Sequence, residues 1–261
     1  MPGAFSMRHS LRRASAVLVL NLVLATAVEA ADIRPAQSVA GSPLPGVTIE
    51  GTIAPGDFAK LASLVLDARG TAVVWLASPG GNLSEALRLG GLIRQLALEV
   101  RAPVDRSRPL VRLRDPENNT CASACFFLYV AGVRRQGSVL GIHKPSLPAD
   151  EYFSLGLDGS VAAHRRIQEA TADYLEHMGV PSRYAAMMMA ANSSEMIWLT
   201  PEDIARDLTG VAAGYEVWLQ GPCRTQVAQP GGAELDCVSP ILAEMQEERR
   251  QRTREHFRGR D

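Results

Sequence analysis

The stretch NTCASACFFLY (119–129) places one serine between two alanines, with a cysteine two residues away on either side. The apolar run after Ser123 predicts a helix, so the serine is expected at the helix N-terminus. A serine hydroxyl attacks a carbonyl only when a base removes its proton and backbone N–H groups stabilise the oxyanion. Small neighbours leave room for that carbonyl. The stretch therefore predicts a nucleophile, with a helix-capping serine as the ordinary alternative.

Two other motifs follow segments that have the pattern of buried strands. The run TAVVWLA leads into SPGG, and SVLGIH ends at His143. Because the carboxyl ends of parallel strands meet at one edge of a sheet, we expect both motifs beside Ser123. Glycine lacks a Cβ, so the N–H of Gly80 or Gly81 can join that of Ala124 in an oxyanion hole. A neutral imidazole at His143 is the natural general base.

Strands and helices must alternate to bring these motifs together, and residues 46–145 have that pattern. GVTIEGTI alternates like a strand, FAKLASLVLDA follows Asp57 as a helix, and SEALRLGGLIRQLA has an apolar helical face. Further on, VAAHRRIQEATADYLEHMG predicts a long helix, and Thr200 is a plausible cap for the next one. This alternation indicates an α/β fold with a parallel sheet. The polar segment 105–120 interrupts the pattern as an exposed loop, long enough to cover a site.

Three landmarks resemble, in order, those of the proteolytic subunit of Clp-type serine peptidases: VVWLASPGGNLSEALRLGGLIR, CASACFFLYVAG and VLGIHKP. The resemblance is nearest to exported Clp-like proteins. It implies an α/β, ClpP/crotonase-like fold over residues 46–220, with repeated ββα units around a parallel sheet. It also implies the roles of the site residues and, because such proteins commonly form rings, a homo-oligomer. The roles are nucleophile for Ser123, general base for His143, and oxyanion hole for Gly80 or Gly81 with Ala124.

The third member of the family's triad is where this sequence departs from the pattern. The family has an aspartate shortly before a helix whose first residues correspond here to WLTPED, and Met196 is in register with it. Glu195 is one residue away and could reach His143 through a bulge. Asn192 could orient the ring instead, or the pair could act without an acid. The departure concerns catalytic competence rather than fold.

Residues 1–30 have the organisation of a signal peptide. Three arginines precede the apolar run ASAVLVLNLVLATAV, and VEA offers small residues for cleavage after Ala30. The apolar run is shorter than the roughly 20 residues of a membrane span, although it could be kept as an anchor. We therefore expect a periplasmic or secreted protein with no membrane span after cleavage. Residues 31–45, rich in proline, alanine and serine, are expected to be a linker.

Export favours disulfides among the four cysteines. Proximity favours Cys121–Cys125 and Cys223–Cys237, although sequence alone leaves three connectivities open. The spacings do not fit a zinc site, and we expect no metal or other cofactor. Residues 221–261 are expected to form a loop that contains cysteines and then a charged, solvated helix.

These features favour an exported Clp-like serine hydrolase, a peptidase that cleaves peptides or unfolded proteins without ATP. A net charge of −1 gives no reason to expect nucleic acid as a partner. The main alternative is a catalytically inactive Clp-fold binding or assembly module, which Met196 favours. An acyl-CoA enzyme of the crotonase type would share the fold, but export argues against it. A Ser–Lys dyad is a further alternative, with Lys60 and Lys144 as the two lysines of the chain.

Overall fold

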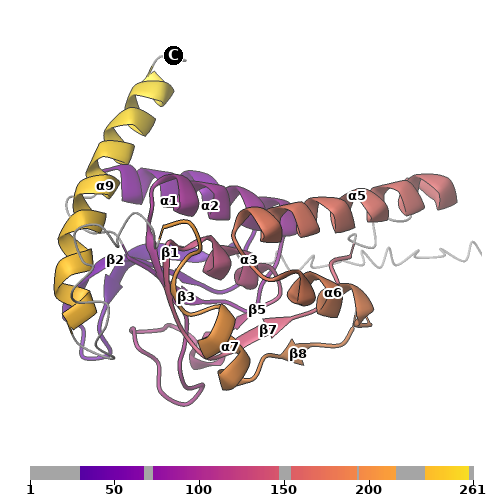
Figure 1. Cartoon of the computed structure of the whole chain (residues 1–261), viewed down its shortest axis with the longest axis horizontal. Coiled ribbons are helices and arrows are strands. Elements are labelled where there is room, and N and C mark those ends of the chain that lie inside the picture. The colour runs from indigo at the N-terminus through magenta and orange to yellow at the C-terminus, as the bar shows by residue number, and fades with distance from the viewer. Residues whose placement is uncertain (1–29, 68–72, 147–153, 193, 216–232, 259–261) are drawn as a thin grey trace, which may run out of the picture.

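The computed structural model describes residues 30–67, 73–146, 154–192, 194–215 and 233–258 (Figure 1). Six strands form the larger sheet, and three form the smaller one. In spatial order the larger sheet holds β1 (Asp32–Gln37), β2 (Pro43–Glu50), β3 (Val73–Ala77), β4 (Glu99–Arg101), β6 (Arg134–Gln136) and β9 (Gly210–Val211). The smaller sheet holds β5 (Cys121–Ala122), β7 (Leu140–Ile142) and β8 (Ile197–Trp198).

The four inner strands of the larger sheet are parallel, and β1 and β9 close its edges in the antiparallel sense. The α/β class with a mostly parallel sheet, predicted from the sequence, is confirmed. Seven helices are described: α1 (Asp57–Asp67), α2 (Leu83–Gln95), α3 (Ala124–Ala131), α5 (Gly156–His177), α6 (Ser182–Ala190), α7 (Pro201–Asp207) and α9 (Ala233–Arg258), with a 3-10 turn, η1 (Pro116–Asn118).

The chain repeats a strand, a second short strand and a helix. In two units, β4–β5–α3 and β6–β7–α5, the first strand belongs to the larger sheet and the second to the smaller one. After β2 and β3, the second strand is reduced to isolated parallel bridges, Ile53 with Gly81 and Ser78 with Cys121. These bridges bring the SPGG turn beside β5, which is the strand that leads into Ser123.

The core explains why β3 and α3 lie where they do. All five residues of β3 and all eight of α3 are buried. A helix that is apolar on every side is stable only inside a protein, so α3 packs in the middle of the molecule against α2. Ser123 is therefore attached to the most buried helix of the described chain.

The loop 102–120 is anchored by one carboxylate. Glu50 is buried at the end of β2 and accepts hydrogen bonds from the backbone N–H groups of Arg114 and Asp115 and from the guanidinium of Arg34. Burial alone would raise the pKa of Glu50, but these donors outweigh it and lower the pKa below its usual value. The ionised carboxylate holds the loop against β2.

Two sequence predictions do not hold for the folded chain. The segment 31–45 is not a linker, because β1 lies within it and pairs with β2. The final helix is not merely solvated: α9 lies along one side of the body, next to α1 (Figure 1). The tail lacks a broad apolar stripe because much of its docking is polar. Arg249 donates to the carbonyls of Arg94 and Gln95, and Arg254 donates to that of Leu66.

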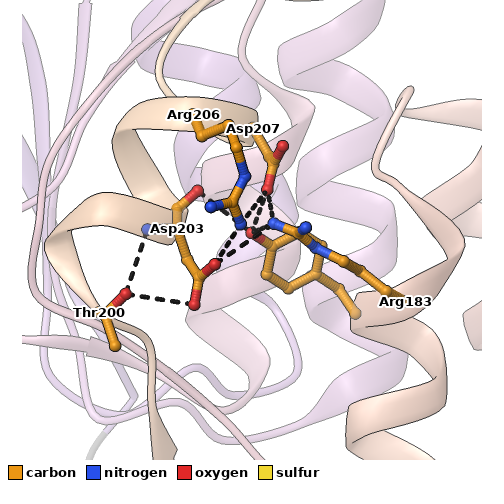
Figure 2. A network of polar contacts seen from close by, with 6 residues as sticks. Arg183, Thr200, Asp203, Arg206 and Asp207 are labelled. Atoms are coloured by element: carbon orange, nitrogen blue, oxygen red, sulfur yellow. Dashed lines mark hydrogen bonds and ion pairs between the residues drawn. The ribbon is translucent and has the colours of Figure 1, made fainter.

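A charged cluster fixes α6 to α7 (Figure 2). Arg183 of α6 pairs with Asp203 and Asp207 of α7, and Arg206 pairs with the same two carboxylates. Thr200 caps α7 by accepting from the Asp203 N–H, as its sequence predicts. The cluster thereby joins α6, which precedes β8, to α7, which follows it.

Candidate active site

Ser123 lies in a sharp turn between β5 and α3 with backbone angles φ 56° and ψ −124°. Residues with a side chain rarely adopt such a conformation, and it is concentrated at functional sites. The Ser123 N–H donates to the Gly141 carbonyl at 2.9 Å, and its own carbonyl accepts from the Phe126 N–H at 3.0 Å. The side chain makes no capping hydrogen bond. The hydroxyl is therefore left free for another partner.

A disulfide between Cys121 and Cys125 spans the serine turn, as predicted. Two cysteines four apart in a regular helix would be poorly placed for a bridge. Here Cys121 belongs to β5 and Cys125 to the first turn of α3, with Cα atoms 5.2 Å apart. Both cysteines are buried. The predicted Cys223–Cys237 pair lies outside the described residues and side chains.

The Ser123 hydroxyl meets His143, which directly follows β7. Ser123 Oγ and His143 Nε2 are 2.5 Å apart, and His143 Nδ1 lies 2.9 Å from the Lys144 carbonyl oxygen. A carbonyl can only accept, so Nδ1 carries the proton and Nε2 of the neutral ring is the acceptor. This tautomer is the one a general base needs. The sequence did not indicate Lys144 as the group that orients the ring.

Neither Glu195 nor Asn192 takes the place of the triad acid. Glu195 is exposed, and its carboxylate accepts from the Asn192 side chain at 3.4 Å. Within the described chain, no carboxylate hydrogen-bonds His143, whose Nδ1 is engaged by the Lys144 carbonyl. The placement of Glu195 at the triad position is therefore wrong for this structure. Glu195 precedes β8, and its carboxylate lies with Asn192 rather than with His143.

Met196 directly precedes β8, and its side chain lines a cavity separate from the one at His143. The antiparallel register of β7 and β8 pairs Gly141 with Trp198 and Ile142 with Ile197, and the pairing ends there. A Cβ built at Gly141 would lie 2.8 Å from the Met196 sulfur, so the thioether packs over β7. A thioether offers a histidine N–H almost nothing.

The SPGG turn presents a free N–H beside the serine. Gly80 donates its N–H to Ser78 Oγ at 3.1 Å, so that group is engaged. The N–H groups of Gly81 and Ala124 donate no hydrogen bond within the described residues, and both residues line the cavity at Ser123. Of the two glycines proposed for the oxyanion hole, Gly81 is therefore the one with an available donor, as Ala124 also is.

Gly80 instead allows the two backbones to approach. It has φ 111°, and a Cβ there would lie 2.5 Å from Ser123 Cβ and 2.9 Å from the Ala124 nitrogen. No side chain fits at that distance, so glycine is required for the SPGG turn to lie against the serine turn.

A cavity of about 430 Å³ opens over Ser123 and His143. Its walls come from α2, α3 and α5, and they are mainly apolar. The apolar side chains are Leu83, Leu87, Phe127, Ile167 and Ala170. The sequence did not single out these residues as site residues, because each fits equally well the apolar face of an ordinary helix.

Tyr174 holds α5 over α3 at this cavity. Its hydroxyl donates to the Phe127 carbonyl at 2.9 Å, and the two rings pack edge to face with centroids 5.8 Å apart. Burial strongly raises the pKa of the Tyr174 phenol, so it remains a neutral donor. This contact fixes the wall formed by α5.

The loop 102–120 does not line the cavity at Ser123. Arg106 stacks over Trp198 at 3.6 Å, and both line a separate cavity with Met196. Of the two lysines proposed for a Ser–Lys dyad, Lys60 pairs with Asp57 on α1, and Lys144 contributes its carbonyl to His143. No cluster of metal-ligating side chains occurs in the described part of the chain. No helix described there is long and apolar enough to span a membrane.

No protein-family model and no curated protein matches the sequence. Among solved structures, the chain is similar to ClpP1 from Listeria monocytogenes and to a point mutant of that protein. The mutant is 14% identical with a TM-score of 0.42, and the unmutated protein is 15% identical with a TM-score of 0.40. Each match covers 61% of this chain and 84% of the other. At these scores the likeness supports no conclusion about activity.

Proposed function

We propose that this chain is an exported Clp-like serine hydrolase that cleaves peptides without ATP. The observation that carries the proposal is the contact of Ser123 Oγ with His143 Nε2 at 2.5 Å, at a serine with an unusual backbone conformation. The order of the SPGG, serine and histidine motifs supports the Clp-like assignment. The signal-peptide pattern supports export, and hence work without ATP, which is scarce outside the cytoplasm.

The site residues suffice for acyl transfer. Ser123 Oγ attacks the substrate carbonyl carbon as its proton passes to His143 Nε2, and the carbonyl oxygen becomes an oxyanion held by the Gly81 and Ala124 N–H groups. Collapse of this intermediate breaks the bond to the leaving amine, which takes the proton from Nε2. Water then attacks the acyl-enzyme by the same route, with His143 again accepting and returning the proton. The products are an acid and an amine.

The Lys144 carbonyl, in place of a carboxylate, should limit the rate of hydrolysis. It fixes the tautomer of His143, but a neutral dipole stabilises the imidazolium less than a carboxylate does. We therefore expect slow turnover. Short or unfolded peptides are the expected substrates, because an exported protein lacks the ATP that would drive unfolding. Association with further copies of the chain stays a prediction from the resemblance alone.

The test is labelling of the mature protein with a fluorophosphonate, which reacts only with an activated serine. We expect Ser123→Ala to abolish labelling and His143→Ala to reduce it by at least about a hundredfold. Ser84→Ala is the matched control, because Ser84 lines the same cavity outside the catalytic turn. Labelling that survives in Ser123→Ala would refute the assignment of the nucleophile.

A second function, a catalytically inactive binding or assembly module, is favoured by one observation. Met196 stands in the sequence where the Clp-type pattern has its acid, and no carboxylate among the described residues hydrogen-bonds the His143 ring. If the folded wild-type protein does not react with the fluorophosphonate, this second function replaces the first.

A further inference from the structure

The cavity at Ser123 combines apolar walls with one exposed cation. Of its lining residues, Leu83, Leu87 and Ile167 are half-buried, and Phe127 is buried. Arg166 also lines the cavity, from the face of α5 next to Ile167. A ligand that fills this space would place hydrocarbon against the walls and its polar end near a guanidinium.

Arg166 has no partner in the described protein. Its guanidinium makes no hydrogen bond, ion pair or ring contact with any described residue. The preceding residue behaves differently, because Arg165 pairs with Glu169 one turn along α5 at 3.9 Å. Glu169 is also three residues from Arg166, a spacing that permits an ion pair, yet it faces Arg165. Among the described residues, nothing therefore neutralises the charge of Arg166 at the cavity.

We propose that Arg166 determines specificity by binding a carboxylate on the substrate, next to an apolar group that occupies the cavity. A guanidinium offers two parallel N–H donors, which match the two oxygens of a carboxylate. A cation beside a partly apolar cleft also raises the local concentration of anions. The substrate class is thus a short peptide or acyl compound with a free carboxylate close to an apolar side chain. This inference deepens the proposed hydrolase function and rests on it.

The test uses binding, so it does not require turnover. Ser123→Ala protein is titrated with 3-phenylpropanoate and with 3-phenylpropanamide, which share the apolar group and differ in charge. Because Arg166 is exposed, we expect the carboxylate to bind about fivefold more tightly at low salt, and this preference to shrink in high salt. Arg166→Gln should remove the preference. Arg165→Gln, the matched control, should preserve it, and Arg166→Lys should preserve part of it.

The outcomes separate this inference from the hydrolase proposal. Equal binding of the two compounds overturns the role of Arg166. A preference that persists in Arg166→Gln also overturns it, because the carboxylate would then occupy the oxyanion hole of Gly81 and Ala124. A lost preference in Arg166→Gln supports the inference even if the wild-type serine fails to react with fluorophosphonate, which tests the hydrolase proposal alone.

Discussion

The disulfide across the serine turn should matter more for reactivity than for global stability. Its two cysteines are only four residues apart, and closing so short a loop stabilises the fold by about 2 kcal/mol. For a protein of this size that corresponds to a fall in Tm of about 4–8 °C when the bridge is removed. The conformation of Ser123, by contrast, is unfavourable by roughly 1–3 kcal/mol and must be held by its surroundings.

Without the bridge, two hydrogen bonds remain to hold the turn: the Ser123 N–H to Gly141, and the Phe126 N–H to Ser123. We expect a substantial fraction of molecules to relax to an ordinary backbone conformation. A shift of about 1.4 kcal/mol in the free energy between the two conformations changes their ratio about tenfold. The fluorophosphonate labelling rate of Cys121→Ala/Cys125→Ala should fall by about that factor.

The assay compares the labelling rate and Tm of this double variant with those of Cys223→Ser/Cys237→Ser. The second variant keeps the bridge at the serine turn, so adding a reductant to it tests the same bond without a substitution at the site. Both treatments should lower labelling, and the untreated second variant should label like the wild type. An unchanged labelling rate together with a lower Tm would refute the reasoning, since the bridge would then act on stability alone.

Three further predictions concern single positions. Gly80→Ala should lower the labelling rate more than tenfold, because its Cβ would meet Ser123 Cβ at 2.5 Å; Gly91→Ala, whose Cβ meets nothing within 4 Å, should leave labelling unchanged. The pKa of Glu50 is lowered in the folded protein, so its contribution to the free energy of unfolding is present above about pH 4.5 and is lost as the pH falls through the folded pKa. Glu50→Gln should therefore have a lower Tm than the wild type at neutral pH, and its Tm should fall less on acidification, as thermal melting at several pH values would show. Met196→Asp should raise the labelling rate at least about tenfold by placing a carboxylate where the Clp-type pattern has its acid, and Met196→Asn is its control.

Sequence reasoning anticipated the parts of the site that depend on local pattern. The run at β3, the SPGG turn and the strand before His143 can each be recognised from neighbouring residues alone. Because parallel strands present their carboxyl ends at one edge of a sheet, these motifs could be expected to lie together. The cysteine pair at 121 and 125 followed from proximity. Glu195 could reach His143 only through a one-residue bulge, which cannot be read from a sequence; in the structure its carboxylate contacts Asn192 instead.

Other parts of the site correspond to no sequence pattern. The Lys144 carbonyl orients His143, and every residue has a carbonyl, so nothing in the sequence marks this one. Arg166 reads as one more charge on a solvated helix until the cavity beside it is seen. The docking of α9 was missed for a related reason: its arginines donate to backbone carbonyls at the ends of α1 and α2 rather than presenting an apolar stripe.

The group that accepts the Nδ1 proton of His143 decides how the site should be understood. That group is the adjacent Lys144 carbonyl, and the Met196 side chain lines a separate cavity. That arrangement preserves the tautomer and the contact with Ser123, which is what the first proton transfer needs. It leaves the imidazolium formed in that transfer without an anionic partner, and the barrier rises accordingly. The contact of Ser123 with His143 and the two free N–H groups are what the proposed slow hydrolysis needs, and labelling with the fluorophosphonate distinguishes it from an inactive module.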